Sequence, residues 1–133
     1  MKTFDVQSVS IGRPAAAVFD FLARPENLPE WTNAFRRADG ESADLATPAG
    51  EVPIRLRTVA SRGSGTVDWH MTFPDGSEGA AYSRVTADGP DRAVYSFVLM
   101  APPVPLEALE GALSEQMAIL AGELAGLKEL LEA

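Results

Sequence analysis

The C-terminal part of the chain carries an apolar stripe that only a long helix can present. Its members recur at spacings of three and four residues, which place them on one side of an α-helix: Leu106, Leu109, Leu113, Met117, Leu120, Leu124, Leu127 and Leu131. At about 1.5 Å per residue this helix is roughly 40 Å long. A helix with one long apolar side has to cover a second apolar layer, which the rest of the chain must supply.

The sequence before this helix is dominated by strand and turn signals. β-Branched and aromatic residues alternate with polar ones in segments bounded by glycine, proline and aspartate, which predicts strands at 4–11, 35–37, 43–47, 52–59, 66–73, 80–86 and 93–100. Pro14 opens a helix over 15–23, and the proline-rich segment 25–31 allows one or two short helical turns. We therefore expect an α+β fold, with an antiparallel sheet of about six to seven strands, two short helices after the first strand and one long C-terminal helix, in a single domain over 1–133.

Turn lengths decide which residues share a face of the sheet. We expect a two-residue turn at 75–76, a loop at 88–91 and a turn at 62–63, with a longer loop at 61–65 as the alternative to the last. These turns pair Leu56 with Trp69, Trp69 with Tyr82, Tyr82 with Phe97 and Arg84 with Tyr95. The face toward the helix then carries Ile54, Leu56, Trp69, Met71, Tyr82, Phe97 and Leu99. The solvent face carries Asp68, His70, Thr72, Ser83 and Ser96.

Charge and composition exclude several classes of function. The 11 basic residues face 19 acidic ones, so the formal net charge is −8, which disfavours nucleic acid and anionic membrane surfaces as partners. Without cysteine and with one histidine, the sequence predicts neither a metal site nor a bound cofactor. No apolar run is long enough to span a membrane, and residues 1–5 lack the apolar core of a signal peptide, so we expect a cytoplasmic protein.

One group of polar residues is predicted to reach the space between sheet and helix. Arg84 with Tyr82 and Tyr95 could bind a carboxylate, or polarise a carbonyl and hold an enolate, which makes these three the candidate catalytic residues. The alternative is that Arg84 pairs with an acid such as Glu51 or Asp88. His70 and Asp68 share a strand face, and we interpret them as a solvated pair rather than as a catalytic base with its orienting carboxylate.

Large apolar residues complete the predicted ligand site. Trp31 and Trp69 could stack on a flat molecule, and the methionines would suit an adaptable pocket wall, although both residue types are also ordinary core pieces. The predicted ligand-binding residues are Trp31, Leu56, Trp69, Met71, Tyr82, Arg84, Tyr95, Phe97, Leu113 and Met117.

The order of these segments resembles the START-like, or SRPBCC, superfamily. The resemblance rests on Ile11–Pro14 followed by Ala17–Leu22, on Pro25–Trp31 and on the closing Leu127–Leu131, and it extends over the whole chain. It implies the helix-grip fold, in which an antiparallel sheet curves around a long C-terminal helix and ligands occupy the cavity between them. The superfamily includes polyketide cyclases and aromatases, lipid-transfer domains, pollen-allergen-type carriers, ring-hydroxylase domains and chaperone activators.

Three functions follow as hypotheses. The first is binding, with transport as its extension, of a small hydrophobic or aromatic molecule or lipid. The second is an enzyme on the same scaffold, a polyketide cyclase, aromatase or dehydratase. The third is a protein-interaction module of the chaperone-activator type with a filled interior. Gly111, Gly122 and Gly126 lie opposite the leucine stripe, and with the edge strands they are compatible with a homodimer.

Overall fold

The computed structural model describes residues 3–47, 50–101 and 106–133, apart from the side chains of 47 and 106–111. Its elements follow in the order β1 (Phe4–Ile11), α1 (Ala15–Leu22), the 3₁₀ turn η1 (Pro25–Asn27), α2 (Leu28–Trp31), β2 (Phe35–Ala38), β3 (Ser42–Thr47), β4 (Gly50–Ser61), β5 (Thr66–Thr72), β6 (Glu78–Ala87), β7 (Ala93–Met100) and α3 (Leu106–Glu132).

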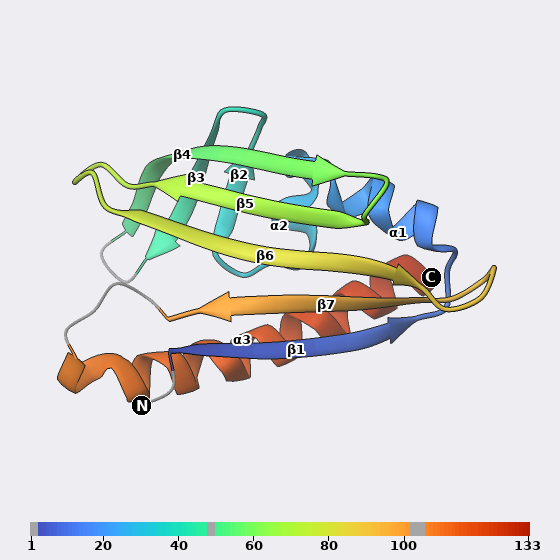
Figure 1. Cartoon of the computed structure of the whole chain (residues 1–133). Helices are drawn as coiled ribbons and strands as arrows, with labels where there is room; N and C mark the ends of the chain where they lie inside the picture. Colours follow the sequence, from blue (N-terminus) through green and yellow to red (C-terminus); the bar gives the residue numbers. More distant parts are fainter. Residues whose placement is uncertain (1–2, 48–49, 102–105) are drawn as a thin grey trace.

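The strands form one antiparallel sheet in the order β1-β7-β6-β5-β4-β3-β2, and β1 and β2 are its edges. The first strand of the chain thus pairs with the last strand, at one end of the meander β2 to β7. Helix α3 runs along β1 on one side of the sheet, and the strands β2 and β3 curve away behind β4 (Figure 1). The predicted α+β helix-grip arrangement, with its two short helices after the first strand, is confirmed.

The apolar stripe of α3 faces the sheet as its spacing predicts. Leu113, Leu120, Leu124 and Leu127 are buried. Met117 and Leu131 are half-buried at the margins of the same stripe. The predicted members Leu106 and Leu109, and Gly111 on the opposite side, lie outside the described side chains.

The C-terminal end of α3 is tied to the segment that follows β1. The backbone N–H of Gly12 donates to Oε2 of Glu132 over 2.7 Å, and Lys128 donates to the same carboxylate. Arg13 Nη1 donates to the carbonyl oxygen of Leu131 over 2.9 Å, which satisfies one of the carbonyls that a helix end leaves without a partner. Sequence positions near 12 and 132 are therefore held together.

The predicted pairing of β5 with β6 is wrong by one residue. Phe73 donates its N–H to the carbonyl of Ser77 over 2.9 Å, so the loop holds three residues, with Gly76 at φ +87°. A three-residue hairpin loop of this kind needs a left-handed residue, which glycine supplies without strain. Trp69 consequently lies opposite Ala81 rather than Tyr82.

The predicted pairing of β6 with β7 is also wrong by one residue. Asp88 donates to the carbonyl of Arg92 over 2.9 Å, which again leaves three residues in the loop. Tyr82 therefore pairs with Val98, and Arg84 pairs with Ser96. The two one-residue shifts compensate each other, so β5 and β7 keep their predicted faces. Only on β6 do the helix-facing and outer residues change places. Its helix-facing residues are Ala81, Ser83 and Val85, and Ser83, predicted on the solvent face, is buried.

The pairing of β4 with β5 differs from the predicted pairing by two residues, and every residue of the two strands stays on its predicted face of the sheet. Ser61 pairs with Thr66, so four residues form the loop, as the alternative at 61–65 predicts. Leu56 lies opposite Met71 instead of Trp69. Because side chains alternate with a period of two, a shift of two residues leaves Leu56 on the helix-facing side.

Gly65 closes this loop against β6, and its substitution should destabilise the fold. Its φ is +75°, and a Cβ built on it would lie 2.2 Å from the carbonyl oxygen of Val85. We expect Gly65→Ala to lower the free energy of unfolding by at least about 1 kcal/mol, because the strand backbone must move away.

Gly63 in the same loop is the matched control. It has an ordinary φ and no atom within 4 Å of a built Cβ. Chemical denaturation of the Gly65→Ala and Gly63→Ala variants makes the comparison, and equal midpoints for the two would contradict the close approach at Gly65.

Candidate functional site

A hollow borders the curved sheet and the helices α2 and α3, and its total volume of about 1550 Å³ extends over both faces of the sheet. Its lining comes from both faces of β4, β5 and β6, so it continues from the helix-facing side onto the outer surface of these strands. On the helix-facing side the sheet contributes Leu45, Leu56, Trp69, Met71, Phe73, Gly79, Ala81, Phe97 and Leu99. The helices and the segment after α2 contribute Leu28, Trp31, Thr32, Asn33, Gln116, Ile119, Leu120 and Glu123. We call these two sets together the inner wall.

Four aromatic rings pack together at the inner side, and three of them, Trp31, Trp69 and Phe97, line the hollow. The ring centroid of Trp31 lies 6.4 Å from that of Trp69, 6.2 Å from that of Tyr95 and 6.4 Å from that of Phe97. Trp69 and Phe97 stack at 6.2 Å. The short helix α2, which ends at Trp31, inserts this indole between rings carried by β5 and β7. Offset and edge-to-face contacts of this kind hold the rings in fixed orientations.

Half of the predicted ligand-binding residues reach the inner wall. Trp31, Leu56, Trp69, Met71 and Phe97 all line it. Four of them lie on strands whose inner and outer faces are predicted correctly, and Trp31 lies on the predicted short helix. Their contact with a ligand stays a prediction, but their placement around one hollow is what a ligand site requires.

The other predicted residues lie elsewhere. Arg84 is exposed on the outer face of β6, so the prediction that it reaches the cavity is wrong. Tyr82 lines the hollow only from that outer face. Tyr95 is fully buried beneath Trp31 and does not line the hollow. Both errors on β6 have one physical cause, the extra residue in each of its two flanking loops.

The two predicted residues of α3 also do not line the hollow. Leu113 is buried in the apolar layer of the fold. The carbonyl oxygen of Met117 accepts a hydrogen bond from Gln7 on β1, over 2.9 Å. This part of α3 packs against β1, and the described side chains of the helix that line the hollow are Gln116, Ile119, Leu120 and Glu123.

Three buried polar atoms lack a hydrogen-bond partner among the described residues: Thr58 Oγ1, Trp69 Nε1 and Tyr95 Oη. Leaving such a group unpaired costs about 1–3 kcal/mol. Burial also raises the pKa of the Tyr95 phenol well above its usual value, so this hydroxyl keeps its proton. Trp69 belongs to the inner wall, but its indole nitrogen is itself buried.

Of the inner-wall residues that the sequence did not predict as ligand-binding, Glu123 is the charged one. It lies on α3 between the buried Leu120 and Leu124, and its Oε2 accepts a hydrogen bond from the Asn33 N–H over 2.7 Å. Burial raises the pKa of its carboxyl, and the bond from Asn33 offsets this only in part. Its position three residues after Leu120 is the signal that could have placed it at the margin of the apolar stripe.

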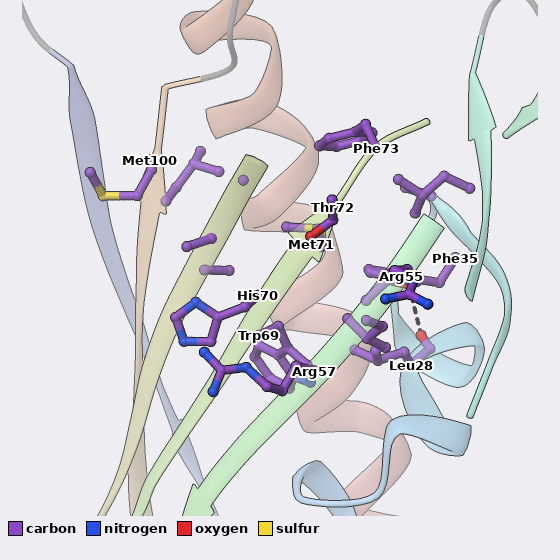
Figure 2. A pocket seen from close by; sticks show the side chains of 18 of the residues that line it. Leu28, Phe35, Arg55, Arg57, Trp69, His70, Met71, Thr72, Phe73 and Met100 are labelled. Carbon is purple, nitrogen blue, oxygen red and sulfur yellow. Dashed lines mark hydrogen bonds between the residues drawn. The ribbon is translucent and has the colours of Figure 1, made fainter. Parts of the chain in front are cut away.

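The outer part of the hollow carries the basic groups. Arg57 and His70 lie opposite each other on β4 and β5, on the side of the sheet away from α3 (Figure 2). The His70 ring packs edge-on against Tyr82, with centroids 6.0 Å apart. The predicted solvent-face position of His70 and Asp68 is therefore correct. Among the described residues, no group of three histidine, cysteine or carboxylate side chains is arranged to hold a metal ion.

The described part of the chain contains no helix that is long and apolar enough to cross a membrane.

Comparison with known proteins gives likenesses of structure alone. No protein-family model and no curated protein matches the sequence. A START superfamily protein from Mycobacterium smegmatis superposes with a TM-score of 0.71 at 14% identity, over 98% of this chain and 99% of that one. The Zhui aromatase/cyclase from Streptomyces sp. R1128 gives 0.67 at 12% identity, over 97% and 93%. The di-domain aromatase/cyclase BexL of the BE-7585A biosynthetic pathway gives 0.70 at 16% identity, over 97% of this chain and 46% of BexL.

Trp31 should be a main support of the fold as well as of the hollow. Its side chain is only 7% exposed and contacts three other rings. We expect Trp31→Ala to lower the free energy of unfolding by about 3–5 kcal/mol, the usual cost of deleting a buried tryptophan. Leu130, 42% exposed on α3, is the control, and its change to alanine should cost less than about 0.5 kcal/mol. Urea denaturation measures both, and a Trp31→Ala loss below 1 kcal/mol, on the order of a surface change, would contradict this role.

Proposed function

We propose that this chain, which has the START-like helix-grip fold, binds a small hydrophobic or aromatic molecule between its sheet and its C-terminal helix. The observation that carries the proposal is the aromatic inner wall of the hollow, on the side of the sheet that faces the helices. Ligand pockets are commonly about 300–1000 Å³ and mainly apolar, with a few polar groups. Trp69 and Phe97 supply flat apolar surfaces, and Glu123 and Asn33 supply polar groups.

The structural neighbours support a binding role of this kind. Two of them are aromatase/cyclases by description, and both superpose over nearly the whole of this chain. The catalytic alternative depends on Arg84, Tyr82 and Tyr95, which do not meet in the hollow. The alternative of a protein-interaction module expects a filled interior, which does not fit the hollow. Binding is therefore the function that the geometry favours.

Two neighbouring residues of β7 allow a sharp test. Leu99 belongs to the inner wall, and Val98 faces the other side of the sheet and does not line the hollow. We expect the folded wild-type protein to bind the neutral dye Nile red, and the fluorescence of the dye to increase on binding. Leu99→Lys should weaken this binding at least about tenfold, because a charge is introduced into an apolar space. Val98→Lys should leave the affinity within about twofold, since the lysine stays in solvent.

Circular dichroism of both variants shows whether each is folded before the titration. Absence of dye binding to the wild type would overturn the proposal. Equal weakening by both lysines, or by neither, would overturn the assignment of the site to the space between sheet and helix.

A further inference from the structure

The helix side of the inner wall presents a carboxylate that has no cationic partner among the residues that the structure describes. Glu123 receives one hydrogen bond, from the backbone of Asn33, and no lysine or arginine of the described residues lies within ion-pair distance of it. Asp39, which also lines the hollow, differs in this respect. Its oxygens accept from Arg37 and from the N–H groups of Glu41 and Ser42, which lower the pKa of its carboxyl to about 2.

The basic groups of the lining stand on the opposite side of the sheet. Arg55 and Arg57 alternate with the buried Ile54 and Leu56 along β4, so they project from the outer face. His70 pairs with Arg57 and projects the same way. Among the described residues of the inner wall, Glu123 is therefore the one ionisable side chain, and the only formal charge that this wall can carry is negative.

The aromatic rings strengthen the preference for positive charge. Asn33 follows Trp31 by two residues, so the Glu123 carboxylate lies beside the end of α2 that delivers this indole. Ring faces attract cations within about 6 Å, and tryptophan does so best. An anion in the same place would meet a like charge and rings with negative faces, and it would lose its hydration without gaining a partner.

We infer that the hollow selects hydrophobic or aromatic ligands that carry a protonated amine, which Glu123 binds, and that it discriminates against carboxylates. This inference rests on the proposed binding function and adds the charge of the ligand. Gln116 lies two helical turns before Glu123 on the same side of α3 and also lines the hollow. The apolar surface of Ile119 and Leu120 separates these polar groups, so the ligand body lies against this surface with its amine at the Glu123 end.

Three probes of one shape test the sign of the charge. Naphthylmethylamine, naphthylmethanol and naphthoic acid are a cation, a neutral molecule and an anion at neutral pH. Calorimetric titration of the wild type should give the amine an affinity at least about tenfold above that of the acid, with the alcohol between them. A competition titration, in which each probe displaces bound Nile red, tests whether the probe and the dye occupy the same hollow.

Glu123→Gln removes the charge and keeps an oxygen that can accept the Asn33 hydrogen bond. It should weaken amine binding at least about fivefold and leave alcohol binding within about twofold. Glu115→Gln is the control, since Glu115 is exposed on α3 and does not line the hollow, and it should change neither affinity.

The outcomes separate the inference from the proposed function. An acid that binds as tightly as the amine, or an amine affinity that Glu123→Gln leaves unchanged, would overturn the inference while binding itself stands. Failure of Nile red and of all three probes to bind would overturn the proposed function and the inference with it.

Discussion

The position of α3 against the sheet is the constraint on which the rest of the structure depends. The helix packs along the edge strand β1 and against α2, and its C-terminal end is fixed by Gly12 and Arg13. A straight helix held at one side of a curved sheet stands away from the sheet's middle. The space left over β4, β5 and β6 is the hollow, so the same packing that makes the fold stable also leaves room for a guest.

The fold was largely predictable because its signals are local. The stripe on α3, Pro14 at the start of α1 and the alternation along β4 each follow from a few residues. The faces of β6 were not predictable in this way, because they depend on loop length. Segments such as Pro74–Ser77 fit a two-residue or a three-residue loop, and a difference of one residue turns a whole strand over.

The candidate site was predictable to the extent that it is apolar. Trp69, Met71 and Phe97 come from strands with strong alternation, and the hollow forms around them. The polar group of the site, Glu123, was not predictable from the sequence. The sequence predicts Arg84 in the cavity only with β6 one residue out of register. It does not single out Glu123, because a glutamate within a leucine-rich helix usually faces water. Only the packing of α3 beside Asn33 distinguishes Glu123 from the exposed glutamates around it.

Both tryptophans of the chain stand at the hollow, with ring centroids 6.4 Å apart and planes inclined by 52°. Indoles this close exchange excitation energy much faster than they emit light, so the pair behaves optically as one chromophore. All tryptophan fluorescence of the molecule therefore arises beside the space that a guest would fill.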